Sequence, residues 1–582
     1  MEFVIGNIVF DGAKSLSDGL YYDCTKDLLL IDNFFIIYEG YIVDETQNVL
    51  HYCKCGLDKI YLPGAYNIFC YDSARNMLIF KNDKRATLPL YYYHKDGKFL
   101  CSNNVWRLVK ILQEAISINM NSLKTQLCFF TDLNIEETLF TNIFRMKGAR
   151  VLKFEGNHGN ICEWNEYWKF VYTPNEMLTL KEAIDDLDRS FKNYFSIIHK
   201  QNLNKILGFG NSGGLDSRLI AHYASLEKIP MEGYVIANHK PHLCLKSTTT
   251  FLSDKIANLY NFHSRIIEYS LHNVEKLFLL DIRNAPFMAS QSFINYYDKI
   301  NFFDYEIAGQ PGGIVYLPDA VLKGNDKDIL LHTEYFLGRR KGTLPKMKDD
   351  LRKMCSYLQI KYNLQNNNGF LGLSHSYLDS VLDYDPLFFR NRLTETIESI
   401  KGRNHVETWI RIHDGLTTKY QYRGGYDSIN GICKSYFLYY PFFYDKIQYY
   451  PLSFFDKRNL LREFIRRINP ALSNIPGQDM HLPGKENRFH SLCKTIEMAM
   501  RGRGLNFDYI LSSVKYKRFV RDVLELNNSY FYSIIDRKKL IKSKLPYTYE
   551  GMSILKIKLL LDIFENKEWD KLENIDFVMC TW

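Results

Sequence analysis

One short stretch, GFGNSGGLDSRLI at residues 208–220, combines the residue types of an anion-binding loop. Its adjacent glycines, Gly213 and Gly214, let the backbone approach a ligand closely and adopt φ values that other residues avoid. The hydroxyls of Ser212 and Ser217, together with the free N–H groups that open a helix, are suited to binding phosphate. The stretch therefore predicts a phosphate site.

A carboxylate, Asp216, stands inside the same stretch. It would repel phosphate unless a cation lay between the two, so Mg²⁺ is implied with Asp216 as its ligand. Arg218 is expected either to turn towards the anion or to lie on the helix surface. The pattern lacks both the Gly-Lys-Ser/Thr of a Walker loop and the GxGxxG of a dinucleotide fold. A glycine-rich turn without a ligand is the alternative interpretation.

The segments around this loop alternate between strand and helix patterns. KILGFG precedes it as an apolar strand, and LDSRLIAHYASL follows it with helical periodicity. MEGYVIAN (strand), STTTFLSDKIANLYNF (helix) and SRIIEYS (strand) come next. This alternation predicts an α/β domain with a doubly wound parallel sheet. Beyond about residue 325 the patterns are mostly helical, which predicts a helical C-terminal half.

The first 172 residues have a different, β-rich pattern. Short apolar or alternating runs such as EFVIGNIVF, YNIFCYD and NMLIFKND end at Gly, Asn or Asp. RVLKFEGNHGNICEWNEYWKF predicts a hairpin with GNHGN as its turn, and NVWRLVKILQEAI predicts a helix. TLKEAIDDLDRSFKNYFSIIHK then begins the next region with a second helix. We therefore expect two domains, residues 1–172 and 178–582.

Composition narrows the class of protein. The net charge of +8 is spread over 582 residues without a long Lys/Arg run, which argues against nucleic acid as a partner. The 12 cysteines show no CxxC pairs and are expected to be reduced thiols. No signal-peptide pattern and no apolar run of membrane-spanning length is visible, so we expect a cytoplasmic protein without a membrane partner.

The motif SGGLDSR in this context resembles the pyrophosphate loop of ATP-pyrophosphatase enzymes. The region from LPGAYNIFCYD to KFLCSN resembles the glutaminase-type domain of class B asparagine synthetases, and the segment ending at Tyr167 and Trp168 resembles that domain's closing segment. The resemblance covers about residues 1 to 270. It implies an N-terminal-nucleophile-type (Ntn-type) αββα sandwich, an ATP-pyrophosphatase domain, and ATP and Mg²⁺ as cofactors. The positions that match the glutaminase pattern are Gly64, Ala65, Tyr71, Asp72, Asp83, Pro89, Leu90, Tyr91 and Ser102.

The chain departs from that family at the glutaminase site. Glu2 stands where those synthetases have the cysteine nucleophile, and Glu39 replaces an Asn of the oxyanion hole. The resemblance therefore implies an inactive first domain. The missing nucleophile, combined with GLDSR in place of the family's GLDSS, resembles the pattern of β-lactam synthetases, carbapenam synthetases and lasso-peptide cyclases. Those enzymes adenylate a carboxylate, release pyrophosphate, and close an amide with an amine on the same substrate.

The family's second metal motif is also altered. Gly309 in IAGQPGGIVYLP matches it and is a candidate cofactor-binding residue, but Gly313 and Ile314 stand where Asp and Glu are expected. Loss of a metal carboxylate matters because the ion neutralises charge on the departing pyrophosphate. Asp216 would have to suffice, or Asp319 or Glu306 would substitute.

A catalytic lysine is expected near SNIPGQDMHLPGKEN. Asp479 and Met480 occupy its position, which leaves Lys485 as the catalytic candidate; a surface loop lysine is the alternative. In SYFLYYPFFYDKI the family-like residues are Pro441, Phe442 and Asp445, whereas Phe437 and Tyr439 replace an acidic residue and an Arg.

Other candidates come from the loops beside the strands. Ile236 ends a strand where the resemblance places the adenine contact. His239, His242 and Cys244 would bind a metal or, as we prefer, belong to a loop near that pocket. Four tyrosines are candidate substrate-facing phenols, with core packing as the alternative: Tyr316, Tyr426, Tyr439 and Tyr440.

The function expected from the sequence is ATP-dependent amide formation on a small molecule or peptide that carries a carboxylate and an amine. The first alternative is a catalytically degenerate relative that binds ATP, a peptide or a partner protein without turnover. The second alternative is a glutamine-hydrolysing asparagine synthetase. A homodimer is possible for each of them.

Overall fold

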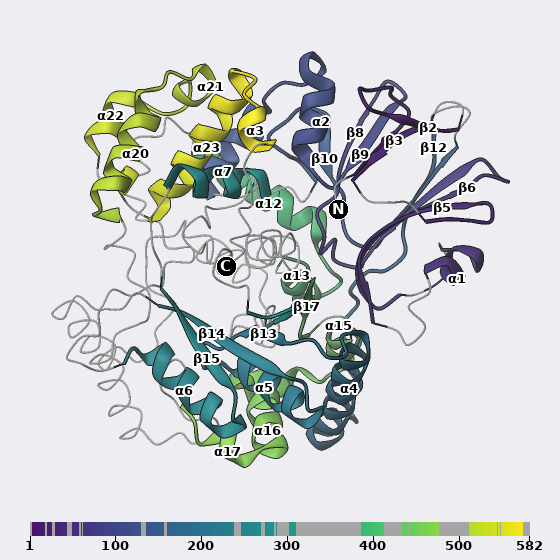
Figure 1. Cartoon of the computed structure of the whole chain (residues 1–582), viewed down its shortest axis with the longest axis vertical. Helices are drawn as coiled ribbons and strands as arrows, with labels where there is room; N and C mark the ends of the chain where they lie inside the picture. Colours follow the sequence, from purple (N-terminus) through teal and green to yellow (C-terminus); the bar gives the residue numbers. More distant parts are fainter. Residues whose placement is uncertain are drawn as a thin grey trace.

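The structure of the chain is a computed structural model. It describes residues 3–17, 20–25, 29–43, 49–57, 60, 62–129, 136–155, 160–237, 246–268, 274–284, 287, 302–309, 386–412, 434–439, 442–476, 511–543, 545–547 and 549–573. The described residues form a pair of antiparallel sheets, a parallel sheet, and a helical C-terminal half (Figure 1).

The N-terminal region holds two six-stranded antiparallel sheets. The first has the strand order β10-β8-β9-β1-β3-β2, and the second β12-β11-β7-β6-β5-β4. The predicted hairpin is confirmed, because β11 and β12 pair antiparallel. The strands are β1 Phe3–Gly6, β2 Lys14–Ser17, β3 Leu20–Cys24, β4 Leu29–Ile31, β5 Phe34–Ile42, β6 Gly64–Asp72, β7 Met77–Asn82, β8 Tyr91–Lys95, β9 Lys98–Ser102, β10 Ile143–Arg145, β11 Arg150–Glu155 and β12 Asn160–Glu166.

Alternation along β1 explains how these sheets stack. Phe3 and Ile5 point into a core shared with the second sheet, whereas Val4 points into the opposite core with helix α2 (Val105–Leu112). Helix α1 (Val49–Lys54) packs on the far face of the second sheet. The layers therefore run helix, sheet, sheet, helix. Helix α2 is followed by the 3-10 turn η1 Gln113–Ala115 and helix α3 Met120–Phe129.

Helix α4 (Leu180–Gln201) opens the second region, and a capping box fixes its start. Thr179 Oγ1 accepts the N–H of Glu182 at 3.2 Å, and the Glu182 carboxylate accepts the Thr179 N–H at 2.8 Å. The predicted apolar face is buried at Ala183, Ile184, Leu187, Phe191 and Tyr194.

The parallel sheet has the strand order β15-β14-β13-β16-β17. The chain runs outward from β13 to β15 and then returns to place β16 on the other side of β13, so the strand order reverses between β13 and β16. In Figure 1, α4, α5, α6 and α16 lie on the same side of this sheet. The elements are β13 Leu207–Gly210, α5 Leu215–Leu226, β14 Met231–Ala237, α6 Thr248–Tyr260, β15 His263–Glu268, α7 Val274–Asn284, β16 Tyr305–Ala308, β17 Lys434–Phe437 and α16 Asn459–Ile468.

In the last part of the chain, helix α23 (Tyr549–Glu565) is buried along residues 551–563 and contacts α7, α20 (Val514–Glu525) and α21 (Ser529–Tyr532). Lys556 on this helix lies 3.2 Å from Asp281, and Lys558 lies 2.6 Å from Asp562, with all four side chains buried. The remaining elements are α12 Pro386–Ile400, α13 His405–Ile412, α15 Phe443–Ile447, η7 Leu452–Arg458, α17 Pro470–Ser473, α22 Arg537–Lys542, η8 Leu545–Tyr547 and α24 Asp570–Glu573.

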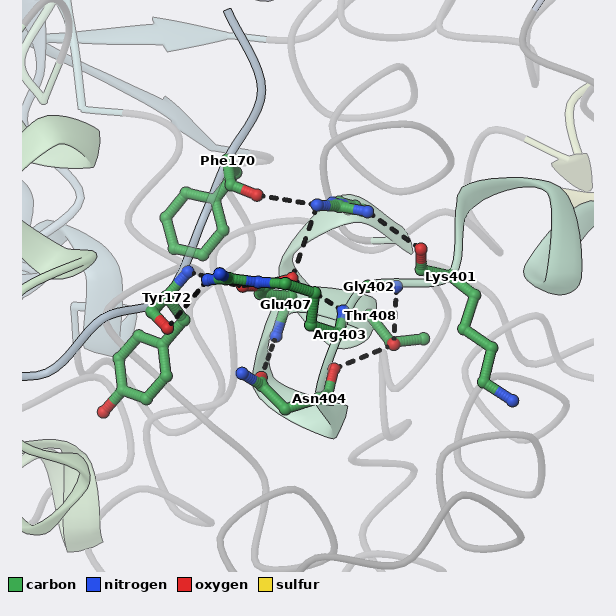
Figure 2. A network of polar contacts seen from close by, with 9 residues as sticks. Phe170, Tyr172, Lys401, Gly402, Arg403, Asn404, Glu407 and Thr408 are labelled. Atoms are coloured by element: carbon green, nitrogen blue, oxygen red, sulfur yellow. Dashed lines mark hydrogen bonds and ion pairs between the residues drawn. The ribbon is translucent and has the colours of Figure 1, made fainter.

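A buried carboxylate, Glu407, joins the segment after the sandwich to helix α13 (Figure 2). It accepts the backbone N–H of Tyr172 at 2.8 Å and that of Arg403 at 2.7 Å. The guanidinium groups of Arg403 and Arg411 also donate to it, at 2.7 Å and 3.4 Å. Burial opposes ionisation, but hydrogen bonds from Arg403 and Tyr172 outweigh it and hold the pKa of Glu407 below its usual value.

Replacing Glu407 by Gln should lower the free energy of unfolding at neutral pH by about 2 kcal/mol, because charge-assisted hydrogen bonds are lost. A carboxyl whose pKa is depressed on folding stabilises the fold above its unfolded pKa, and this contribution is lost as pH falls through the folded pKa. The difference between parent and variant should therefore shrink below about pH 4.5. Urea unfolding across that range measures it, and a pH-independent difference would contradict the assignment.

Cys24, Cys53, Cys55, Cys70 and Cys101 are free thiols. Within the described ranges, none of the helices combines the length and apolar character needed to cross a bilayer.

Candidate functional site

The loop between β13 and α5 begins where the strand order of the parallel sheet reverses. Asn211, the first residue after β13, holds its base: its N–H donates to the carbonyl of Tyr234 at 2.7 Å, and its side chain donates to the carbonyl of Ser253 at 3.0 Å. Gly233 allows this approach, since a Cβ there would lie 2.9 Å from the Asn211 Cβ. The loop is therefore anchored to β14 and α6.

Gly213 is required by both conformation and space. Its φ is +79°, and a Cβ at this position would lie 2.3 Å from the Cβ of Leu252 on α6. A positive φ is unfavourable for residues with a Cβ, and the contact is too close for the helix to absorb without moving. The loop therefore packs flat against α6.

The remaining polar groups of the loop face the start of α5. Ser212 Oγ accepts the N–H of Gly214 at 3.4 Å, a long hydrogen bond, and Ser217 Oγ donates to the Gly214 carbonyl at 2.9 Å. Gly214 is the N-cap residue of α5 and contributes no side chain. The first-turn N–H groups of a helix have no acceptor within it, which makes this an electropositive end.

Asp216 brings three strand ends together. Its carboxylate Oδ1 accepts a hydrogen bond from the hydroxyl of Tyr439, which follows β17. Gly309, which follows β16, packs against it so closely that a Cβ would lie 2.7 Å from the Asp216 Cβ. The Tyr439 ring is buried and packs edge-on against Phe191 and Phe443. Asp216 itself is half-buried at the carboxyl edge of the sheet.

Both orientations expected for Arg218 are wrong. Its side chain is fully buried behind the loop, and its guanidinium donates to backbone carbonyls at Gly213, Leu472, Ile475 and Pro476. The sequence could not show this, because three of the four carbonyls come from a segment more than two hundred residues away.

The other candidates on the sheet lie on its second face. Ile236 belongs to β14 and contacts a small apolar cluster with Tyr234 and Phe303. Glu306, offered as a substitute metal ligand, is buried within β16 and accepts a hydrogen bond from the Tyr234 hydroxyl. That partner gives Glu306 a place inside the sheet rather than at its edge.

Several candidates lie outside the described residues: Lys485, His239, His242, Cys244, Gly313, Ile314, Tyr316, Asp319, Tyr426, Tyr440, Pro441, Asp479 and Met480. Within the part of the chain that is described, no group of three or more His, Cys, Asp or Glu side chains could hold a metal ion. A Mg²⁺ ion nevertheless fits one carboxylate, because it commonly keeps waters and takes its other oxygens from phosphate. Asp216 meets that requirement.

In the sandwich, Glu39 is enclosed by amides. It accepts hydrogen bonds from Asn67 at 3.1 Å and from Asn103 at 2.9 Å, and Asn103 also accepts the N–H of Phe3 at the start of β1. Burial raises the pKa of Glu39, and the two amide hydrogen bonds partly offset this. A carboxylate here supplies acceptors where an oxyanion hole would need donors.

Two other motif residues prove to be structural. Asp83 is buried and holds the turn that follows β7, accepting hydrogen bonds from Thr87 Oγ1 at 2.9 Å and from the Arg85 N–H at 2.9 Å. Asp445 forms an ion pair with Lys84 of the sandwich at 2.5 Å. Asn211 and Leu252 support the loop without being predicted from the sequence pattern, although Asn211 directly precedes the serine and the glycines.

No family model matches the chain, and no curated protein matches it significantly. Solved structures with some similarity include the glutamine phosphoribosylpyrophosphate amidotransferase from B. subtilis complexed with ADP and GMP, with 12% identity, a TM-score of 0.19, and coverage of 41% of this chain and 60% of that one. A structure of the allosteric regulatory enzyme of purine biosynthesis has 11% identity, a TM-score of 0.16, and coverage of 41% of this chain and 62% of that one. The chain thus spans about three fifths of each structure's length. TM-scores this low identify neither a shared fold nor a shared function for this chain.

Proposed function

We propose that the chain is an ATP-dependent amide-forming ligase that adenylates a carboxylate and closes an amide without using glutamine. The observation that carries the proposal is the position of the SGGLDS loop and Asp216 beside the reversal in strand order. Ligands of open α/β sheets bind at the carboxyl ends of the strands at such a reversal.

Different residues of the loop would bind different parts of Mg·ATP. The N–H groups of the Gly213–Ser217 turn and the Ser212 hydroxyl would receive the β and γ phosphates. Asp216 would hold Mg²⁺, Gly309 leaves the space that the Asp216 carboxylate fills, and the backbone of Ile236 would meet adenine. The positive φ of Gly213 supports this assignment, because it shapes the tight turn that opens α5.

ATP would supply an adenylyl group to the substrate carboxylate with loss of pyrophosphate, after which the substrate's amine displaces AMP. Lys485 stays a prediction as the catalytic lysine. We further propose that the sandwich is an inactive Ntn-type domain. The enclosure of the Glu39 carboxylate by Asn67 and Asn103 supports this, because no oxyanion donor stands at that position.

Calorimetric titration of Mg·ATP into the full chain and the Asp216→Ala variant tests the proposal. We expect micromolar binding in the parent and a loss of about 100-fold or more in the variant, because the metal carboxylate is gone. Asp254→Ala is the matched control, since Asp254 lies on the neighbouring helix α6 and pairs with Lys246 at the surface. Equal affinity in the parent and Asp216→Ala would refute the loop as the nucleotide site.

Tyr439→Phe should weaken Mg·ATP binding about 10-fold. The variant removes the hydroxyl that orients the Asp216 carboxylate and keeps the packing of the ring. Tyr436→Phe is the control: this tyrosine is also buried, on β17 itself, and its hydroxyl accepts a hydrogen bond from Asn202 at 2.9 Å, away from the loop. Tighter binding in Tyr439→Phe would show instead that the phenol competes with the metal for Asp216.

The second candidate, a binding protein without turnover, is favoured by the buried phenol that already occupies one oxygen of Asp216. Product analysis separates the two functions, because a ligase supplied with substrate yields AMP and pyrophosphate, whereas a binder leaves ATP unchanged. A glutamine-dependent synthetase would in addition release glutamate from glutamine, and we expect none.

A further inference from the structure

The guanidinium of Arg218 donates hydrogen bonds to backbone carbonyls through all three of its nitrogens. Nε and Nη2 donate to the Gly213 carbonyl at 3.3 Å and 3.0 Å. Nη1 donates to Leu472 at 2.9 Å and Ile475 at 2.6 Å, and Nη2 also donates to Pro476. A guanidinium has five N–H donors in a rigid planar fork, so this arrangement fixes the carbonyls relative to one another.

The bonds to Gly213 set the direction of one loop peptide. In a trans peptide the C=O and the following N–H point in opposite directions. The Gly213 carbonyl faces Arg218 behind the loop, so the N–H of Gly214 faces forward, towards Ser212 Oγ at 3.4 Å. That hydrogen bond is long enough to be replaced by a stronger one to an anion. The contacts of Arg218 thus orient the Gly214 N–H towards the front of the loop.

The bonds to residues 472–476 reach a second segment. Leu472 belongs to the short helix α17, and Ile475 and Pro476 follow it. The Leu472 carbonyl also accepts the Ile475 N–H at 3.3 Å, and carbonyls at a helix C-terminus carry partial negative charge, which suits a buried cation. The same guanidinium therefore joins this segment to the back of the loop.

We propose that Arg218 is a positioning residue that orients the Gly213–Gly214 peptide for pyrophosphate and couples the loop to residues 472–476. The inference rests on the proposed function and extends it. Filling the loop strengthens the Gly214 contact on one side of the peptide, and Arg218 transmits any shift of that peptide to the carbonyls on the other side. A lysine at this position has one donor centre and cannot span both segments.

The test combines ligand titration with native-state hydrogen exchange on the full chain. Arg218→Lys should lower the affinity for both Mg·ATP and inorganic pyrophosphate about 100-fold, the loss typical of a displaced binding group. Without ligand, exchange should accelerate at the amides of Asn474 and Ile475 as well as in the loop. Pro476→Gly adds backbone freedom at a carbonyl that Arg218 binds and leaves α5 unaltered. This variant should therefore also weaken pyrophosphate binding. Arg145→Lys, a buried arginine of the sandwich, is the matched control.

The outcomes are distinct. Binding by the parent with unchanged affinity and unchanged exchange in Arg218→Lys would overturn the inference and leave the proposed function intact. Weaker binding with exchange accelerated only in the loop would overturn the coupling. A parent that binds neither Mg·ATP nor pyrophosphate would refute the proposed function and the role of Arg218 with it. Weaker binding with faster exchange in both segments supports the proposal, provided that Arg145→Lys behaves as the parent.

Discussion

Replacing Gly213 by Ala should lower Mg·ATP affinity at least about 100-fold and destabilise the fold by about 2 kcal/mol. Two causes act together. The backbone must leave a φ of +79°, and the new methyl group would lie 2.3 Å from the Cβ of Leu252. Since that atom is attached directly to the backbone of α6, a rotamer change cannot relieve the contact. Calorimetry and urea unfolding measure the two effects.

Gly97→Ala is the control that separates the effect of backbone strain from the effect of a substitution in the candidate phosphate loop. Gly97 has a φ of +74° but no atom within 4 Å of the added Cβ, and it lies in the turn between β8 and β9. This control should lose about 1 kcal/mol through backbone strain and bind Mg·ATP as the parent does. If Gly213→Ala bound Mg·ATP normally, the loop would not be the phosphate site.

Breaking the buried pair Lys558–Asp562 should have the largest effect on stability. Both side chains are buried on α23, with Nζ 2.6 Å from Oδ2. Asp562→Leu alone should cost about 3–5 kcal/mol, because it leaves a buried ammonium without its counter-ion. The double variant Lys558→Met with Asp562→Leu should be nearly neutral, because burying two apolar groups avoids the desolvation cost. A double-mutant cycle by urea unfolding measures the coupling.

The pH dependence of this pair has a defined sign. Burial raises the pKa of Asp562, so its contribution to stability is greatest below the usual Asp pKa and falls as pH rises. Burial lowers the pKa of Lys558, so its contribution is greatest above the usual Lys pKa and falls as pH drops. Near neutral pH, burying the charged forms of both Lys558 and Asp562 destabilises the fold. The double variant lacks both charges, so its stability should not show the pH dependence that this pair causes. A double variant as unstable as Asp562→Leu would contradict the account.

Local patterns predicted much of the fold. Short apolar or alternating runs ending at Gly, Asn or Asp predicted strands of the sandwich, because successive strand residues point to opposite faces and both faces are covered here. The apolar run LLLIDNFFIIY, however, is two strands, β4 and β5, joined at Asp32, whose φ is +54°. The polar pair Asp32 and Asn33 is the local signal that divides the run, because these residue types tolerate the left-handed conformation of a turn.

The candidate site divides in the same way. Glycines, hydroxyls and a carboxylate in a strand–loop–helix context predicted the loop, since these residues act within a few positions of one another. The predictions for Arg218 and Glu306 were made without their partners, the 472–476 carbonyls and the Tyr234 hydroxyl, which approach from distant segments. Lys485 lies outside the described residues, so its role stays a prediction.

The sequence by itself determined the strand, turn and helix around residues 212–217 and led to the proposal of a phosphate site there, because backbone conformation and helix-end electrostatics are local. Only the tertiary structure decided which groups meet there. The reversal of strand order brings the ends of β13, β16 and β17 to one edge, and this places Gly309 and Tyr439 on Asp216. Contacts between residues so far apart in the chain depend on sheet topology, which no local pattern encodes.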